Sequence, residues 1–319
     1  MKHIAVVTPC YNEVENIAQM AKAVQAVFRD LGDYSYTHLF IDNGSTDGSR
    51  KMLRDLASKH DNIACVFNAR NFGYTRSAFY GLLLPDADAT ILLSCDFQEP
   101  PEMIVDFLKK WEDGAEVVGG IKTASRENMI KRALRTAYYK IINRMSEVEL
   151  VDHFFDFGLY DRGVILELRR IPDVKPYLRG LICEFGYEIV QIPFTQQSRK
   201  AGKTKFSLGD LIDTAMTGLV NQMRVPLRLV TYLGVVIFMI SFAVAIYYFF
   251  LKMLYWDSFS FGVAPAILGI FFFGAINLIG IGILAEYIGA IYTQMLRRDL
   301  VREFTRLNED ALGFPDRTD

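Results

Sequence analysis

The chain has 319 residues, a formal net charge of −2 and a hydrophobic fraction of 51%. A net charge this close to zero provides no global basic field, so nucleic acid is excluded as the expected partner. The hydrophobic excess is concentrated after Arg224, which predicts a polar first part and an apolar second part. The N-terminal apolar stretch, from Ile4 to Val7, is too short for the hydrophobic region of a signal peptide.

Strand-like and helix-like segments alternate through the first part of the chain. Expected strands lie at residues 4–8, 38–42, 63–67, 90–94, 116–120 and 188–193. Expected helices cover residues 14–28, 49–59, 75–84, 102–112 and 129–145, the last of them basic. This alternation predicts an α/β domain with a mostly parallel, Rossmann-like sheet covered by helices on both faces.

Polar clusters follow the first four expected strands. They lie at residues 9–13, 42–47, 68–73 and 96–99. Ligands of such sheets bind beyond the carboxyl ends of the strands, so we expect these four clusters to line the functional site. A further polar segment at 196–204 contains Arg199 and Lys203 and is predicted to be a loop.

The four cysteines form neither a CxxC pair nor a Cys/His pattern with metal-ligand spacing. They are Cys10, Cys65, Cys95 and Cys183. We expect reduced, buried thiols in a cytosolic domain.

Two uncharged apolar runs, at 229–251 and 263–285, are long enough to cross a ~30 Å hydrocarbon core as helices. Several basic residues precede the first run or follow the second, whereas Lys252 is the one basic residue between the runs. The flanking residues are Arg224, Arg228, Arg297, Arg298 and Arg302. This asymmetry predicts an inner-membrane protein of two transmembrane helices, with its first domain and both termini in the cytosol.

The sequence therefore divides into four regions. They are a catalytic-type domain at 1–206, an amphipathic juxtamembrane helix at 207–228, two transmembrane helices at 229–292, and a cytosolic tail at 293–319. Two interpretations of the amphipathic helix remain open: it lies in the membrane interface, or it packs on the first domain. Asn277 is suited to contact with the other span or with a neighbouring subunit, so a homo-oligomer also stays open.

The cluster after the fourth strand contains Asp96 and Gln98, two residues apart. Side chains at this spacing can both face a divalent ion and a diphosphate, and oxygen ligands of this kind suit Mg²⁺ or Mn²⁺. The alternative is a simple helix cap ahead of Pro100-Pro101.

Taken together, the motifs resemble the GT-A family 2 glycosyltransferases, in particular those that act on polyprenyl phosphates. The motifs are Pro9-Cys10-Tyr11-Asn12-Glu13, Asp42-Asn43-Gly44-Ser45-Thr46-Asp47, Arg70-Asn71-Phe72-Gly73, the Asp96 cluster, Phe155-Asp156-Phe157-Gly158-Leu159, the segment from Arg199 to Phe206, and Glu286-Tyr287-Ile288-Gly289. The resemblance covers nearly the whole chain. It implies a GT-A catalytic domain that transfers a sugar, with inversion, from a nucleotide sugar to a polyprenyl phosphate. A UDP-linked donor and undecaprenyl phosphate are the expected substrates, and cell-envelope glycan modification is the expected role.

The resemblance also implies roles for individual residues. Nucleotide binding is implied for Pro9, Tyr11, Glu13, Asp42 and Arg70. Catalytic roles are implied for Asp96 and Asp156, and metal binding for Asp96, Gln98 and Asp156. Contact with the acceptor phosphate and the diphosphate is implied for Arg132, Arg199, Lys203 and Lys205, with Lys131 and Arg135 as alternatives to Arg132.

This chain departs from the family pattern at three positions. Ser94 stands where an Asp is frequent, Asn43 where a second Asp is common, and Gly158 where an Arg is common. A hydroxyl is a weaker ligand for a hard cation than a carboxylate, so Ser94 predicts weaker metal binding or compensation by Asp156.

An acceptor phosphate explains why no general base stands out, because a phosphate monoester is already ionised near neutral pH. Two other functions remain open. A non-catalytic membrane scaffold would explain Ser94. A processive polysaccharide synthase is disfavoured because the chain lacks a Gln-x-x-Arg-Trp motif and has too few spans for a channel.

Overall fold

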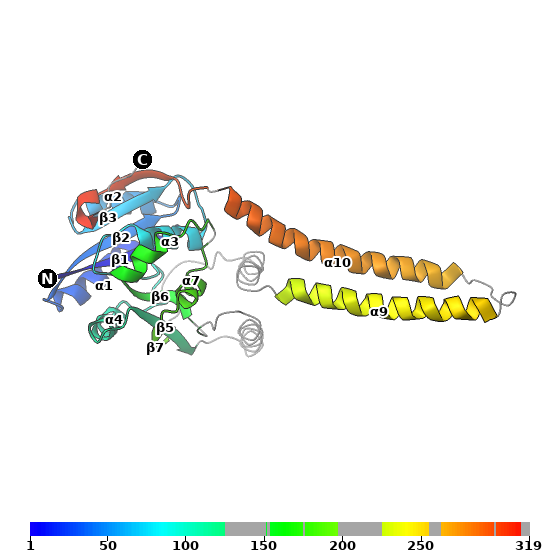
Figure 1. The fold of residues 1–319 in the computed structure, drawn as a ribbon. Coiled ribbons are helices and arrows are strands. Elements are labelled where there is room, and N and C mark those ends of the chain that lie inside the picture. The colour runs from blue at the N-terminus through cyan, green and yellow to red at the C-terminus, as the bar shows by residue number, and fades with distance from the viewer. Residues whose placement is uncertain are drawn as a thin grey trace.

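The computed structural model describes residues 1–124, 151, 154–174, 176–196, 225–254, 263–296 and 298–313. Its centre is an eight-stranded sheet with the order β7-β5-β6-β4-β1-β2-β3-β8 (Figure 1). The strands are β1 (Lys2–Cys10), β2 (Tyr34–Asp42), β3 (Ile63–Asn68), β4 (Ala89–Leu92), β5 (Val117–Ala124), β6 (Phe154–Asp161), β7 (Ile189–Thr195) and β8 (Glu303–Leu307). The helices are α1 (Val14–Arg29), α2 (Ser49–Ala57), α3 (Tyr74–Leu83), α4 (Met103–Glu112), α6 (Arg162–Leu168), α7 (Leu178–Glu184), α9 (Val225–Leu254) and α10 (Val263–Met295), with a short 3₁₀ turn η1 (Glu309–Leu312).

The predicted mostly parallel sheet is confirmed. Strand β1 pairs in parallel with β2 and β4, β2 pairs in parallel with β3, and β5 pairs in parallel with β7. The antiparallel strands are β6, which lies between β4 and β5, and β8, which pairs with β3 at the edge. The carboxyl ends of β1 to β4 therefore meet along one edge of the sheet, as expected for a Rossmann-like domain.

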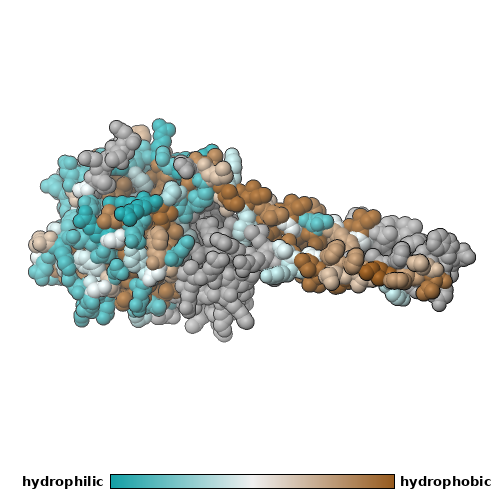
Figure 2. Space-filling model, viewed as in Figure 1, coloured by the Kyte–Doolittle hydropathy of each residue, from teal (hydrophilic) through white to brown (hydrophobic). Residues whose placement is uncertain are grey.

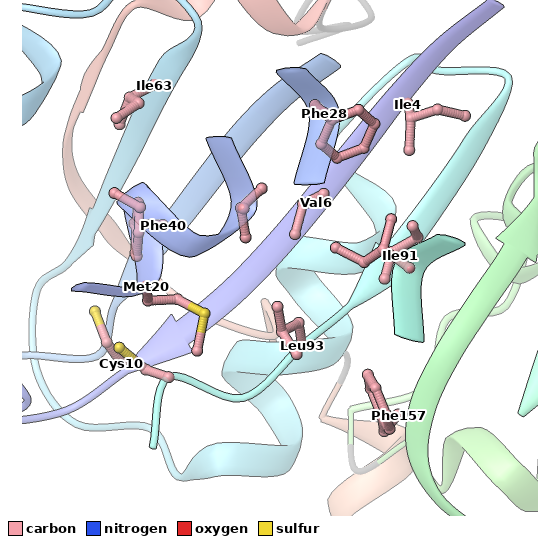
Figure 3. Close-up of a cluster of buried hydrophobic side chains, with 14 of the residues drawn as sticks. Ile4, Val6, Cys10, Met20, Phe28, Phe40, Ile63, Ile91, Leu93 and Phe157 are labelled. Atoms are coloured by element: carbon pink, nitrogen blue, oxygen red, sulfur yellow. The ribbon is translucent and has the colours of Figure 1, made fainter. Parts of the chain in front are cut away.

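Helices cover both faces of the sheet because successive strand residues point to opposite sides. Phe40 belongs to a buried cluster with residues of α1, α2 and α4 on one face, whereas its neighbours Leu39 and Ile41 belong to a cluster with residues of α3, α6 and α7 on the other. Figure 3 shows the first of these clusters, in which Met20 and Phe28 of α1 lie over the strands. On the opposite face α3 lies close to the sheet, since a Cβ on Gly81 would come within 2.6 Å of the Ile41 side chain.

The end of the chain forms part of the sheet, which the division into four regions did not predict. Residues 293–319 were expected to be a cytosolic tail, but Glu303–Leu307 forms β8 and pairs with β3 through Cys65, Val66, Phe67 and Asn68. The side chain of Asn308 then donates to the carbonyl oxygens of Ala57, His60 and Ile63. Strand β8 thereby covers the edge of β3, whose backbone groups on that side would otherwise lack hydrogen-bond partners in the sheet.

Both apolar runs are helical and extend from the domain as a pair of contacting helices (Figure 1). Gly280 of α10 lies against α9, where its Cβ would meet the Val230 side chain at 3.5 Å. Hydrophobic residues dominate the surface of the described parts of both helices, in contrast to the polar domain (Figure 2). By length and composition, the segment Phe272–Met295 is one helix able to cross a membrane, and Val230–Val244 is a shorter apolar segment. The crossing of a membrane by two helices stays a prediction.

The expected basic helix at 129–145 and most of the amphipathic helix at 207–228 lie outside the described residues.

Candidate functional site

The turn after β1 and the loop after β2 are held together by backbone-to-side-chain hydrogen bonds. Asn12 has a positive φ of 54°, its N–H donates to Ser45 Oγ at 2.8 Å, and its Oδ1 accepts from the N–H of Thr46 at 2.7 Å. The N–H of Glu13 donates to Ser49 Oγ at 3.0 Å. Asn is one of the few residues that adopt a left-handed conformation readily, which explains its place in this turn.

The predicted nucleotide-binding residues of the first strand lie in and beside this turn. Pro9 is buried within β1, whereas Tyr11 and Glu13 are half-buried. The Glu13 carboxylate accepts a 2.6 Å hydrogen bond from Asn16. Burial raises the pKa of Cys95, in the loop after β4, and the negative charges of Glu13 and Asp96 raise it further. Glu13 therefore lies close enough to this loop to act on Cys95. The β1 turn and the β4 loop therefore face a common region.

Asp42, at the end of β2, is fully buried and engaged within the protein. Its carboxylate accepts a 2.8 Å hydrogen bond from Arg50 Nε and hydrogen bonds of 3.2 and 3.3 Å from the N–H of Ser45. Arg50 also donates to the carbonyl oxygen of Asn68. In this structure Asp42 thus stabilises the loop that follows it.

Asn43 connects the loops after β2 and β3. Its amide donates to Asn71 Oδ1 at 2.9 Å and to the Gly73 carbonyl at 3.1 Å, and its Oδ1 accepts from the Phe72 N–H at 3.0 Å and from Asn68 at 3.2 Å. An ionised carboxylate has no N–H to donate, so this arrangement needs an amide. This need for a side chain that both donates and accepts explains why Asn43 stands where an Asp is common in the family pattern.

Arg70 lies on the loop after β3, next to the loop that carries Asn43. Its side chain is exposed, and its guanidinium carbon stands 4.1 Å from the centre of the Phe72 ring. Its Nη1 donates to the carbonyl oxygen of Asn71 at 2.9 Å.

The turn after β4 carries Asp96 and Gln98. Asp96 is 8% exposed, and its Oδ1 accepts a 3.1 Å hydrogen bond from the N–H of Gln98. Phe97, between them, has a positive φ of 59°. The Gln98 side chain accepts a 2.6 Å hydrogen bond from Gln196, which follows β7. This hydrogen bond connects the end of β7 to the Asp96 motif. The positive φ of Phe97 is a conformation that costs a residue with a side chain some strain.

Asp156 comes from β6, which lies beside β4 in the sheet, and its φ is 66°. Its Oδ1 is buried and has no hydrogen-bond partner among the described residues. Burial raises the pKa of Asp156, and the charge and backbone N–H of Arg179 oppose that shift. A buried carboxylate oxygen left unpaired is costly, so this atom is a candidate for contact with a ligand.

Glu99 is a third carboxyl group close to Asp96 and Asp156. The sequence pattern placed it in the cluster at 96–99 but gave it no role of its own. Burial raises the pKa of Glu99 to about 8; hydrogen bonds from Ser94 oppose the shift, while the charges of Asp96 and Asp156 add to it. The signal that could have identified Glu99 is its position directly after Gln98 in the same motif. Tyr160 was also missed, and its hydroxyl donates to the Asp156 carbonyl at 2.7 Å.

Gly158 stands beside Asp156 on β6, where no side chain fits. A Cβ at this position would collide with the carbonyl oxygen of Val118 on β5. The arginine that is common here in the family pattern is therefore incompatible with this strand pairing.

The structure brings Asp96, Gln98 and Asp156 to one end of the sheet, with the β1 turn nearby. Two carboxylates and an amide are hard oxygen donors. Within the described ranges, no group of three or more His, Cys, Asp or Glu side chains is arranged to hold a metal ion. Magnesium commonly binds through one or two carboxylates together with substrate phosphates, so the donor set fits a metal shared with a diphosphate. The predicted residues Arg132, Arg199, Lys203 and Lys205 lie outside the described residues.

Comparison with known proteins identifies the family. The family model "Glycosyl transferase family 2" matches residues 5–169. The uncharacterized glycosyltransferase YkcC of Bacillus subtilis (strain 168) is 29% identical over 302 residues, covering 94% of this chain and 93% of its own. The bactoprenol glucosyl transferase of Shigella phage SfII is 30% identical over 296 residues, covering 92% and 95%. A crystal structure of glucosyl-3-phosphoglycerate synthase from Mycobacterium tuberculosis, with Mn²⁺, UDP and phosphoglyceric acid, aligns with a TM-score of 0.45 at 17% identity, over 69% of this chain and 76% of that one. From the family model and these full-length relatives, we conclude that the chain is a glycosyltransferase and belongs to glycosyl transferase family 2.

Proposed function

We propose that this protein transfers a sugar from a nucleotide sugar to a polyprenyl phosphate at a membrane surface. The observation that carries the proposal is the buried Oδ1 of Asp156, which has no hydrogen-bond partner in the described part of the chain and lies on the strand next to the Asp96 turn. Support for the acceptor comes from the relative named bactoprenol glucosyl transferase, which matches 92% of this chain. The apolar helices α9 and α10 would keep the site beside a lipid substrate.

The donor would bind along the carboxyl ends of β1 to β4. Tyr11 and Glu13 are half-buried in the β1 turn and would contact the base and ribose, with Pro9 fixing the start of the turn. Asp42 would act from behind, by holding the loop after β2 through Arg50 and Ser45. Arg70 would reach the nucleotide from the loop after β3. We propose UDP as the nucleotide.

A Mg²⁺ or Mn²⁺ ion would be held by Asp96, Gln98 and Asp156 together with the donor diphosphate. When bound, the ion supplies charge stabilisation to the leaving nucleoside diphosphate. Asp96 is oriented for this role by the N–H of Gln98, and the Gln98 side chain is fixed by Gln196. Side chains held in this way need little reorganisation when the reaction occurs.

The acceptor phosphate would attack the anomeric carbon directly, with inversion. A phosphate monoester carries about −1.5 to −2 charges at pH 7, so it needs positioning and charge neutralisation more than a general base. Arg132, Arg199, Lys203 and Lys205 would supply the positive charges. Because the acceptor is a lipid, these basic residues can reach its phosphate only if the site lies beside a membrane, so their role and the membrane anchoring are parts of one proposal.

We further propose that α9 and α10 form a two-helix membrane anchor with the catalytic domain on the cytosolic side of the inner membrane. The catalytic domain would comprise residues 1–206, the juxtamembrane helix would comprise 207–228, and the anchor would comprise 229–292. Strand β8, which follows the anchor in the sequence, pairs with β3 of the domain. Undecaprenyl phosphate is the acceptor that we expect, in a pathway of cell-envelope glycan modification.

The experiment that tests this function is transfer to undecaprenyl phosphate by the purified full-length protein. A panel of UDP- and GDP-sugars is supplied with Mg²⁺, with Mn²⁺, and with a chelator. We expect one UDP-sugar to give a lipid-linked product that requires the added metal. Binding without transfer for every donor would favour the alternative, a non-catalytic scaffold, and formation of a polymer would favour a polysaccharide synthase.

A further inference from the structure

Three arginines from separate parts of the chain come together where α10 rejoins the domain. The guanidinium carbons of Arg70 and Arg76 stand 4.1 and 5.6 Å from the centre of the same Phe72 ring. Arg76 Nη2 also donates a 2.7 Å hydrogen bond to the carbonyl oxygen of Asp299, the residue that follows Arg298. We refer to Arg70, Arg76 and Arg298 as the arginine cluster.

The positive charge of the arginine cluster is not neutralised by this part of the protein. Among the described residues, none of the three side chains forms an ion pair with a carboxylate. Burial lowers the pKa of Arg76, and the positive charges of Arg70 and Arg298 lower it further. The Nε of Arg76 is buried and has no partner within the described ranges. Guanidinium groups held close together in this way favour an anionic ligand that can accept from more than one of them.

The position of the arginine cluster indicates where that anion comes from. Arg298 lies three residues after Met295, where the apolar segment Phe272–Met295 ends. If this segment spans the membrane, the residues that follow it stand at the level of the lipid headgroups. Basic side chains at that level attract the phosphates of anionic lipids.

We propose that Arg76 and Arg298 of the arginine cluster bind the phosphate groups of anionic lipid headgroups and thereby fix the catalytic domain against the membrane surface, while Arg70, which we assign to the nucleotide, adds positive charge beside them. This inference rests on the proposed membrane crossing by α10 but not on the sugar-transfer chemistry. Arg76 is the central contact, since it joins α3 to the segment that follows α10. Each arginine near an anionic surface contributes about fivefold to binding.

The test uses the full-length protein in detergent and three soluble probes. These are dihexanoylphosphatidylglycerol, dihexanoylphosphatidylcholine and inorganic phosphate, each titrated while the thermal unfolding midpoint is recorded. We expect the anionic lipid to raise the midpoint at a lower concentration than the other two probes. The double variant Arg76→Gln/Arg298→Gln should weaken the apparent affinity for it about 25-fold.

The matched control is Arg29→Gln, which removes one charge from an exposed arginine on α1 and should leave the response unchanged. If the double variant does not fold, Arg298→Gln alone should still weaken binding about fivefold, because this side chain is exposed. An unchanged response in the variants overturns the proposal. An equal response to inorganic phosphate, lost in the same variants, overturns the lipid as the source of the anion. Sugar transfer by the same samples in detergent is measured separately, so failure of the proposed function is distinguishable from failure of lipid binding.

Discussion

The backbone N–H of Ser94 donates a 2.8 Å hydrogen bond to Oε2 of Glu99 across the turn after β4. Ser94 is the position at which this chain lacks a frequent aspartate of the family pattern. An aspartate here would place another negative charge beside Glu99, whose pKa burial already raises to about 8. The serine instead stabilises Glu99, so the turn keeps a carboxylate near Asp96 and Asp156 without adding a further charge.

Glu99→Gln is expected to change how stability depends on pH. Between the unfolded pKa of about 4.5 and the folded pKa of about 8, the native protein binds a proton at Glu99 that the unfolded chain does not. Stability should therefore fall as pH rises through this interval, by up to about 1.4 kcal/mol per pH unit. The variant removes the titrating group and should flatten that slope. Unfolding midpoints recorded from pH 4.5 to 8 check this, and an unchanged slope would contradict it.

Asp96→Asn and Asp156→Asn are expected to reduce sugar transfer by roughly 10²–10³-fold while preserving the fold. Each change removes one negative charge that we propose faces the metal and diphosphate. Because burial raises the pKa of Asp156, a neutral amide there should not lower the unfolding midpoint. Transfer rates, with Mn²⁺ binding measured by calorimetry, test the two variants. The control is Asp55→Asn, an exposed carboxylate on α2; near-normal transfer in both site variants would refute the assignment.

Asn43→Asp restores a residue common in the family pattern but should destabilise this protein. The carboxylate cannot donate to Asn71 Oδ1 or to the Gly73 carbonyl, and it would face both acceptors directly. We expect a loss of about 1–3 kcal/mol in the free energy of unfolding and weaker donor binding. Denaturant unfolding and donor titration measure these effects. Gln19→Glu, which makes the same chemical change on the exposed face of α1, should have little effect.

Gly158→Ala is expected to destabilise the sheet by about 1–3 kcal/mol, because the added methyl group meets the Val118 carbonyl oxygen. The β5–β6 pairing would have to shift, and Asp156 would shift with it. Thermal unfolding and transfer assays should both report the change. The comparison variant is Gly32→Ala, where a Cβ has no neighbour within 4 Å; equal effects of the two variants would rule out this explanation.

Much of the fold followed from local patterns. The predicted strands at 4–8, 38–42, 63–67 and 90–94 all overlap strands of the structure, because buried parallel strands have continuous β-branched runs. The four polar clusters lie at the carboxyl ends of those strands for the same geometric reason. The hydrogen bonds within these clusters could not be predicted, because bonds such as those of Asn43 depend on loop backbones that come together only in the folded protein.

Three features escaped the sequence analysis for identifiable reasons. Strand β6 lies in an aromatic segment, and its antiparallel insertion between β4 and β5 depends on long-range pairing. Strand β8 has only five residues, and its sequence Glu-Phe-Thr-Arg-Leu has no strong strand signal after a long apolar helix. The role of Glu99 depends on its burial beside two other carboxylates, which neither composition nor spacing encodes.

The return of the chain to β3 through β8 means that the long helices are attached to the catalytic domain at both ends. On one side the domain leads into α9, and on the other α10 leads back to a strand fixed in the sheet. The hydrogen bond from Tyr80 to Glu303 adds a fastening at this second attachment. A domain joined to its helices by two connections is more restricted in its rotation than a domain joined by one. In the membrane arrangement that we propose, the β3–β8 pairing would therefore limit how far the reactive edge tilts relative to the bilayer.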